Sequence, residues 1–418
     1  MYDAWMDALE EKEFSGVCLL DMSAAFDIVD HSLLLKKLEL YGFQEECLEW
    51  IKSYLSGRSQ CVSINGSLSR LLPVPTGVPQ GSILGPVFYT LFTNELPELV
   101  HDHHDEDEQQ EHGGWSSYNM KCKSCGNVCC FADDTTYSCS DSDLASLSEK
   151  LSSKFRILSD FLVSNKLKLN DGKTHLLVLT TSQKRKKRGQ DLGVSISTPT
   201  ATVTPTSAEK LLGGWIHQDL KWAEHIQDSK DSLIKSLSTR LSALKMVGKV
   251  ASFKTRKMIA DGIFISKLSY LISLWGGCEE YLLTSLQTIQ NKAARSVTKM
   301  DWSTSTRVLL SQCGWLSVRQ LARYHTVVLV FKVLQTGSPR YLHSMFNNQY
   351  LIKTRLSKKE LIKPANSDTP TLDLTQSSFR WRAMEQYNLL PLDIRSAPTI
   401  TKFKKLTKKW IMENTSVV

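Results

Sequence analysis

Short apolar runs that end at turn residues mark the strands expected in the first half of the chain. Residues 17–20 form such a run between Gly16 and Asp21, so they predict a buried strand with Asp21 at its exit. The dipeptide Asn65-Gly66 predicts a hairpin turn within a segment of alternating polarity. The strands expected by the same criteria are the hairpin at 61–72, the pair 127–131 and 135–138, and the single strand 176–179.

Apolar residues spaced three and four apart predict helices over much of the remaining chain. Asp30 stands where it can cap the helix at 31–40, and Gly42 follows that helix. The other helices expected from spacing are 44–55, 87–96, 143–165, 223–247, 251–275, 280–298, 318–335 and 402–411. Strands therefore concentrate before about residue 220 and helices after it, which indicates an α+β protein.

Composition places the chain among folded proteins with more than one domain. It has 418 residues, of which 41% are hydrophobic and 22% charged, and such a length allows two or three domains. No run approaches the roughly 18 apolar residues of a membrane span, and the acidic start lacks the pattern of a secretory signal. We therefore expect an intracellular protein without a transmembrane segment.

The two halves of the chain carry opposite net charges. The net charge of +8 splits into −10 for residues 1–220 and +18 for residues 221–418. The acidic first half is suited to metal chemistry, and the basic second half is suited to contact with a polyanion. The basic run at 184–188 and the Thr/Pro/Ser-rich residues after it, to 207, predict a flexible connection.

An acidic and cysteine-rich segment interrupts the first half. Residues 101–112 hold six carboxylates, four histidines and no apolar side chain, which predicts an exposed, poorly ordered insertion. Cys122 and Cys125 have a spacing found in zinc sites. Cys129 and Cys130 are adjacent on an expected strand and point to opposite faces, so burial of these thiols is the favoured alternative to zinc.

Three carboxylates stand at strand ends: Asp21, Asp133 and Asp134. Hard divalent cations such as Mg²⁺ prefer oxygen ligands, and two ions about 4 Å apart can assist phosphoryl transfer. An aspartate in a turn is otherwise an ordinary turn residue. Asp30 is better explained as a helix cap, and Asp27 as a brace for the loop after the strand.

Five motifs in one order give these residues a context. They are LLDMSAAFDIVDH at 19–31, TGVPQGSILGP at 76–86, FADDTTYS at 131–138, LKLNDGKTHLLVL at 167–179 and LLGGWIHQDLKWAEHI at 211–226. Together they resemble the reverse transcriptases of non-LTR (LINE-type) retrotransposons. The resemblance covers roughly residues 10 to 300 and implies a right-hand polymerase palm followed by a helical thumb.

The resemblance implies catalytic roles for particular residues. Asp21, Asp133 and Asp134 would bind two Mg²⁺ ions, and Lys173 would protonate the leaving pyrophosphate. Phe26 matches an aromatic steric gate that excludes a ribose 2′-hydroxyl by clash. A core position is the alternative for Phe26, and a solvated turn lysine is the alternative for Lys173.

The same resemblance implies substrate and primer contacts. Gln80 and Gly81 correspond to a loop that borders the incoming nucleotide and the template. Gly213, Gly214 and Trp215 correspond to a primer grip, although paired glycines also suit any tight turn.

The resemblance also implies a division of the chain and a set of partners. Residues 1–220 would be the palm with the insertion at 101–130, residues 221–335 the thumb, and residues 336–418 a basic C-terminal region. The implied activity is RNA-directed DNA synthesis, with an RNA template, a DNA primer and deoxynucleoside triphosphates as partners, in the nucleus and cytoplasm.

Two alternatives remain open at this stage. The resemblance begins almost at the Asp21 strand, so the fingers that hold the triphosphate are expected to be largely missing. The first alternative is therefore an inactive retroelement remnant that only binds RNA or a primer–template. The second is an interaction module stabilised by zinc. Oligomeric state does not follow from these features.

Overall fold

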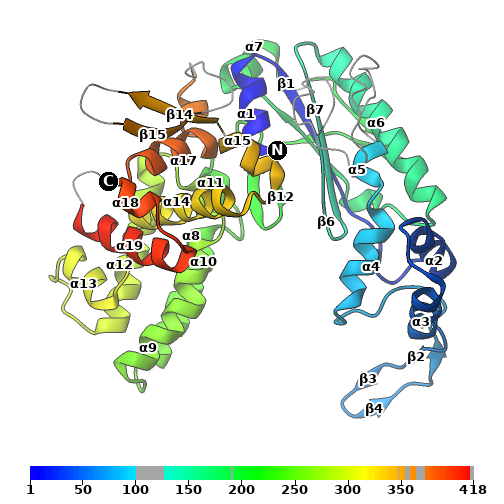
Figure 1. Cartoon of the computed structure of the whole chain (residues 1–418), viewed down its shortest axis with the longest axis horizontal. Coiled ribbons are helices and arrows are strands. Elements are labelled where there is room, and N and C mark those ends of the chain that lie inside the picture. The colour runs from blue at the N-terminus through cyan, green and yellow to red at the C-terminus, as the bar shows by residue number, and fades with distance from the viewer. Residues whose placement is uncertain (100–126, 190–191, 347, 354–357, 364–371, 415–418) are drawn as a thin grey trace. The chain divides into compact units, whose positions relative to one another are not determined.

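The computed structural model describes residues 1–99, 127–189, 192–346, 348–353, 358–363 and 372–414 (Figure 1). The chain divides into two compact units. The first contains residue 1 and residues 11–212, and the second contains residues 2–10 and 213–418. The α+β architecture expected from sequence is confirmed. In the described ranges no helix is long and apolar enough to cross a membrane.

A five-stranded sheet forms the centre of the first unit, in the order β11-β8-β1-β7-β6. The central strand β1 pairs antiparallel with β7 on one side and β8 on the other. β6 pairs antiparallel with β7, and β11 runs parallel to β8. The strands are β1 (Phe14–Leu20), β6 (Asn127–Phe131), β7 (Asp134–Asp141), β8 (His175–Leu179) and β11 (Pro205–Thr206).

Helices cover this sheet and share a core with it. Side chains of α6 pack on β1 and β7, and Leu147 and Leu151 are fully buried there. Asp30 caps α2 by accepting a 2.9 Å hydrogen bond from the Leu33 backbone N–H, as predicted. The helices of this unit are α2 (His31–Leu40), α3 (Glu45–Leu55), α4 (Leu84–Thr93), α5 (Leu96–Leu99), α6 (Leu144–Ser164), η1 (Asp171–Lys173) and α7 (Ser182–Arg188).

The predicted hairpin about Asn65-Gly66 is present. Both residues have positive φ, 49° and 85°, which is the geometry of the two-residue turn that asparagine followed by glycine favours. Ser63 pairs with Leu68 and Ile64 with Ser67. The short strands of this unit outside the main sheet are β2 (Ser59–Gln60), β3 (Ser63–Ile64), β4 (Ser67–Leu68), β5 (Leu72–Pro73), β9 (Ile196–Ser197), β10 (Thr202–Val203) and β12 (Ala208–Leu211).

The prediction that residues 184–207 form a flexible connection is wrong for the described residues. The basic run lies in α7, where Thr181 caps the helix. The Lys184 ammonium lies 3.5 Å from the centroid of the Phe14 ring, and Arg185 donates a 2.8 Å hydrogen bond to the Val178 carbonyl. Two of the basic side chains are therefore held against the sheet by their long stems and cationic heads.

The second unit is mainly helical, as expected for residues after 220. One of its hydrophobic cores surrounds the stacked rings of Phe331 and Phe403, whose centroids are 3.9 Å apart. Its elements are α1 (Tyr2–Glu10), β13 (Gly214–His217), η2 (Glu224–Asp228), α8 (Leu233–Val247), α9 (Phe253–Ala260), η3 (Asp261–Ile265), α10 (Ser266–Ser269), α11 (Ile272–Trp275), α12 (Glu280–Thr298), α13 (Thr306–Cys313), α14 (Val318–Thr336), α15 (Arg340–Phe346), β14 (Asn348–Lys353), β15 (Lys358–Lys363), α16 (Asp373–Gln376), α17 (Phe379–Asn388), α18 (Leu392–Arg395) and α19 (Ile400–Glu413).

The helix predicted over 251–275 is interrupted in the structure. A π-helical turn, η3, separates α9 from α10, and Leu271 has a left-handed φ of 57° between α10 and α11. No proline marks either break, and leucine at position 271 is not a residue type that favours a left-handed conformation. The hydrophobic spacing persists through them, because Phe264, Leu268 and Trp275 are all fully buried.

The first helix belongs to the second unit rather than to the sheet that follows it. Trp5, Met6 and Leu9 are buried. On the polar side Arg380 binds both carboxylate oxygens of Asp7, at 2.5 and 3.1 Å. The chain thus passes from the second unit to the first after residue 10 and returns after residue 212.

Candidate active site

The register of the central sheet determines where the predicted carboxylates lie. The last pair between β1 and β7 joins Leu20 to Thr135. Asp21 follows Leu20 and Asp134 precedes Thr135, so the two aspartates stand across from each other on neighbouring antiparallel strands. Asp133 lies in the turn between β6 and β7, where Phe131 pairs with Asp134. The strand ends therefore bring Asp21, Asp133 and Asp134 to one end of the sheet.

Electrostatic coupling within this group is visible at Asp134. Partial burial raises the pKa of its carboxyl group, and the negative charges of Asp133 and Asp21 raise it further. The ammonium of Lys173 opposes that rise. The group is thus one in which like charges repel, and a cation relieves the repulsion.

Asp21 is held by the segment that precedes β8. Asn170 donates a 3.2 Å hydrogen bond from Nδ2 to Asp21 Oδ2, and its backbone N–H donates a 2.9 Å hydrogen bond to the Asp21 carbonyl. Lys173 Nζ lies 3.3 Å from the same Oδ2 atom. Lys173 was predicted from the sequence, whereas Asn170 was not singled out, although it stands in the same LKLNDGKT motif.

Metal-ligand geometry is not assembled in the described residues. No group of three or more His, Cys, Asp or Glu side chains in those ranges is gathered closely enough to hold an ion. The predicted zinc ligands Cys122 and Cys125, and the insertion at 101–112, lie outside the described residues. Cys129 is exposed and Cys130 is half-buried, where it accepts a 3.8 Å hydrogen bond from the Thr135 hydroxyl.

Phe26 packs against the core of the first unit. Its ring is partly buried, with its centroid 4.5 Å from that of Tyr89. The Tyr89 hydroxyl donates a 3.2 Å hydrogen bond to Met22 Sδ. Burial raises the pKa of Tyr89, and the negative charge of Asp133 raises it further, which places Tyr89 within electrostatic reach of the hairpin. Sequence reasoning missed Tyr89 because a tyrosine among the apolar residues of a helix looks like an ordinary core residue.

The loop carrying Gln80 and Gly81 is tied to the segment after β1. Gln80 Nε2 donates a 2.8 Å hydrogen bond to Asp27 Oδ1, and the Val78 N–H donates a 2.8 Å bond to the Phe26 carbonyl. Gly81 has a φ of 82° and faces open space. The structure thus brings the loop of Gln80 and Gly81 next to Phe26 and Asp27.

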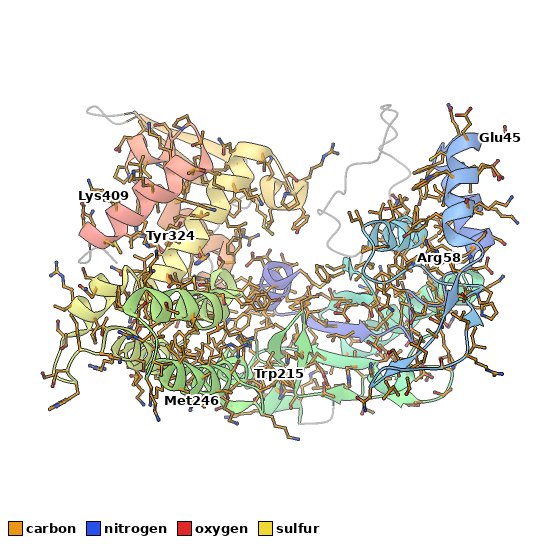
Figure 2. All side chains as sticks on the ribbon, turned by 90° about the horizontal axis from the view of Figure 1, so that it is seen from below. Glu45, Arg58, Trp215, Met246, Tyr324 and Lys409 are labelled. Atoms are coloured by element: carbon orange, nitrogen blue, oxygen red, sulfur yellow. The ribbon has the colours of Figure 1, made fainter. Side chains whose placement is uncertain are left out.

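The predicted primer-grip residues begin the second unit. Gly213 has a φ of 81°, and Leu212 before it also has a positive φ, so the turn requires the left-handed conformation twice. Trp215, which is labelled in Figure 2, donates a 2.8 Å hydrogen bond from its indole Nε1 to Asp231. These residues and the three aspartates belong to different units.

Comparison with known proteins agrees with the motifs and the sheet. Residues 6–206 match the family described as reverse transcriptase (RNA-dependent DNA polymerase). Residues 6–206 are a reverse transcriptase domain. The resemblance to non-LTR retrotransposon enzymes found from sequence is confirmed.

The similarity of this chain to several curated relatives extends beyond residues 6–206. The RNA-directed DNA polymerase from mobile element jockey of Drosophila funebris is 26% identical over 308 residues, which are 72% of this chain and 30% of the relative. The probable RNA-directed DNA polymerase from transposon X-element of Drosophila melanogaster is 26% identical over 71% of this chain and 30% of the relative. The chain therefore spans about 30% of the length of the curated relatives that it matches.

One solved structure similar to the chain is a telomerase from Candida albicans, determined with a fragment of telomeric RNA. The two chains are 15% identical, and the alignment covers 82% of this chain and 54% of the telomerase chain, with a TM-score of 0.39.

Proposed function

We propose that the chain synthesises DNA on an RNA template by adding deoxynucleoside triphosphates to a DNA primer. The observation that carries this proposal is the register that sets Asp21 across from Asp134, beside the turn that holds Asp133. The match of residues 6–206 to the reverse transcriptase family supports it. A chain with this activity would meet its nucleic acids in the nucleus or the cytoplasm.

Asp21, Asp133 and Asp134 are the residues that would hold Mg²⁺. Their carboxylates are the hard oxygen donors that Mg²⁺ prefers, and their mutual repulsion favours occupancy by cations. Two bound ions would lower the pKa of the attacking primer hydroxyl and offset charge on the phosphates. Asn170 fixes the Asp21 side chain, and the exposed ammonium of Lys173 is the group proposed to give a proton to the leaving pyrophosphate.

Phe26, Gln80 and Gly81 are proposed to border the incoming nucleotide. Phe26 is supported from behind by Tyr89, so its ring is held where it could exclude a 2′-hydroxyl by contact. Gly81 presents backbone without a side chain, which allows close approach of a ligand. Gly213, Gly214 and Trp215 are proposed to contact the primer.

Primer extension by the full chain tests the proposed function. A DNA primer annealed to an RNA template should be extended when Mg²⁺ and deoxynucleoside triphosphates are present, and extension should stop when EDTA removes the metal. Binding of the primer–template without any extension, at all Mg²⁺ concentrations, would instead support the inactive binding remnant.

The Phe26→Val variant should accept ribonucleotides more readily. Removing the ring leaves space for a 2′-hydroxyl, and pockets of this kind discriminate by about 10- to 200-fold. We expect the preference for deoxy over ribo triphosphates, measured as a ratio of kcat/KM, to fall by at least about tenfold. Phe43→Val, at another half-buried phenylalanine of the same unit, should leave that ratio unchanged. An unchanged ratio in Phe26→Val would assign Phe26 to the core alone.

The Asp134→Asn variant should be more stable than the natural chain when Mg²⁺ is absent. The substitution removes the repulsion that raises the pKa of this carboxyl group. Because the group is exposed, the gain should be less than about 1 kcal/mol. Adding Mg²⁺ should raise the melting temperature of the natural chain and should raise that of the variant less. Equal stabilisation of both proteins by Mg²⁺ would argue against Asp134 as a ligand.

A further inference from the structure

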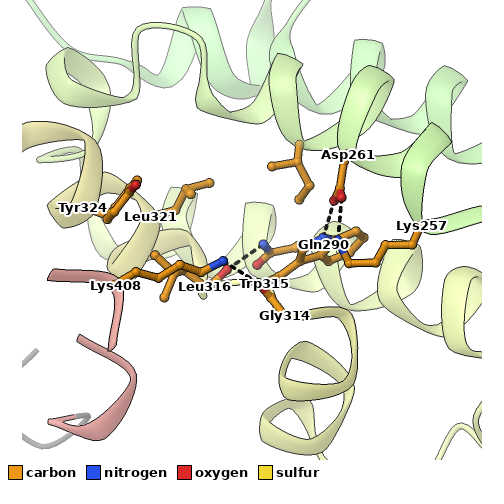
Figure 3. Close-up of a pocket in the computed structure, with 10 residues that line it drawn as sticks. Lys257, Asp261, Gln290, Gly314, Trp315, Leu316, Leu321, Tyr324 and Lys408 are labelled. Atoms are coloured by element: carbon orange, nitrogen blue, oxygen red, sulfur yellow. Dashed lines mark hydrogen bonds and ion pairs between the residues drawn. The ribbon is translucent and has the colours of Figure 1, made fainter. Parts of the chain in front are cut away.

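A cavity of about 230 Å³ lies inside the second unit and belongs to none of the sites described above (Figure 3). Its walls come from α9, η3, α12, α14 and α19, together with the loop between α13 and α14. The π-helical turn η3 supplies Asp261 and Ile265 to it, and such turns occur frequently at functional sites. The cavity is smaller than the pockets that enclose drug-sized ligands, so it suits one planar group.

The lining combines aromatic and apolar surface. Trp315 and Leu321 are buried in its wall, and the half-buried ring of Tyr324 borders it. Figure 3 shows Tyr324 and Leu321 on one side of the cavity and Trp315 on the other. Aromatic rings at a partly open cavity form the kind of surface on which a nucleobase stacks.

Two lysines and one aspartate line this cavity, so its net charge is positive. Asp261 is neutralised, because its Oδ1 accepts a 2.6 Å hydrogen bond from the Trp315 indole and its Oδ2 lies 2.6 Å from Lys257 Nζ. Lys408 Nζ donates a 2.9 Å hydrogen bond to the neutral Gly314 carbonyl. Within the part of the chain that the structure describes, the Lys408 ammonium pairs with no carboxylate.

Further positive charge lies along the same helix. The lysines of α19 are Lys402, Lys404, Lys405, Lys408 and Lys409. Residues 221–418 together carry a net charge of +18. A negatively charged strand would therefore be drawn toward the helix that supplies Lys408 to the cavity.

We propose that this cavity binds an unpaired nucleotide within a single strand of nucleic acid. The base enters against the Tyr324 ring, and the adjoining phosphate meets the Lys408 ammonium. A base in a duplex is paired and stacked, so it cannot enter without first being extruded. The inference does not rest on the polymerase activity, because the cavity shares no residue with the three aspartates.

Binding of labelled twelve-nucleotide strands to the full chain tests the inference. The probes are a strand of twelve adenosines, a strand of twelve deoxyadenosines, and the adenosine strand paired with its complementary RNA. Tyr324→Ala should weaken binding of both single strands about tenfold, the effect expected for loss of one stacked base. Binding of the duplex should change less than twofold. Tyr324→Phe should bind like the natural chain, because the ring is retained.

Matched variants separate the cavity from general charge and aromatic surface. Lys408→Ala should weaken single-strand binding more than Lys409→Ala. Lys409, which is labelled in Figure 2, carries the same charge on a side chain that is 74% exposed, and its Nζ lies 3.9 Å from Glu413 Oε1. Tyr281→Ala removes an exposed tyrosine of the same unit and should have no effect. If Tyr324→Ala fails to fold, Tyr324→Leu keeps the apolar bulk and should show the same selective loss.

Two results would overturn the inference. One is that Tyr324→Ala binds both single strands as tightly as Tyr281→Ala does. The other is that free adenosine monophosphate displaces the strands at equal nucleotide concentration, because the ligand would then be a free nucleotide. The readout is strand binding and not primer extension, so failure of the polymerase proposal leaves this test intact.

Discussion

The Asp133→Asn variant is expected to lose at least about a thousandfold in the rate of RNA-templated DNA synthesis. Asp133 lies in the turn that β6 and β7 share, and its charge acts on both Asp134 and Tyr89. Replacing a carboxylate that holds a catalytic cation removes several kcal/mol of transition-state stabilisation, and about 4 kcal/mol corresponds to a thousandfold change in rate.

Single-turnover extension of a preformed complex would measure this effect without interference from binding. Primer–template affinity should change little, because most of the positive charge lies in residues 221–418. Asp160→Asn, an identical charge change on the exposed side of α6, is the control and should retain full activity. Activity of Asp133→Asn within tenfold of the natural chain would contradict the assignment of the metal site.

The Gly77→Ala variant is expected to lose about 2 to 5 kcal/mol of stability in the first unit. Gly77 has a φ of 89°, which costs other residues about 1 to 2 kcal/mol. A Cβ atom there would also lie 2.6 Å from the Asp27 carbonyl oxygen, and relieving such overlap costs about 1 to 3 kcal/mol. The loop would be forced away from Asp27, and the hydrogen bond from Gln80 would be lost with it.

Gly66→Ala is a matched control for this prediction. Gly66 has nearly the same φ, 85°, but nothing lies within 4 Å of an added Cβ. It should therefore lose only the conformational part, about 1 to 2 kcal/mol. Urea unfolding of both variants would measure the difference, and primer extension should fall in Gly77→Ala alone. Equal destabilisation of the two variants would show that the 76–81 loop can move freely from the segment after β1.

Features fixed by local chemistry could be predicted from the sequence. The Asp30 cap and the Asn65-Gly66 turn depend on residues only a few positions apart, and both are present. The strands that end at Asp21 and begin at Asp134 were also recognisable, because apolar runs stop there. That these ends meet is a property of the register between β1 and β7.

Features that depend on tertiary partners could not be predicted. The basic run in α7 has the composition of a solvated segment, and tertiary contacts such as those with the Phe14 ring and the Val178 carbonyl hold it in place. Asn170 and Tyr89 were missed because their roles depend on the residues they contact, Asp21 and Phe26, and the sequence does not indicate these contacts. The break at Leu271 likewise reflects packing around it rather than a helix-breaking residue type.

The position of α1 in the second unit has a consequence for how the chain is made. Arg380 bonds with Asp7 across 373 positions, and the Leu372 N–H bonds with Glu10 across 362. A ribosome therefore makes α1 long before it makes Leu372 and Arg380, which bind that helix. Until then α1, which carries the apolar side chains of Trp5, Met6 and Leu9, lacks its native contacts with Leu372 and Arg380. This is the situation in which nascent chains aggregate or engage chaperones, so translation speed and chaperone supply should govern the yield of folded protein.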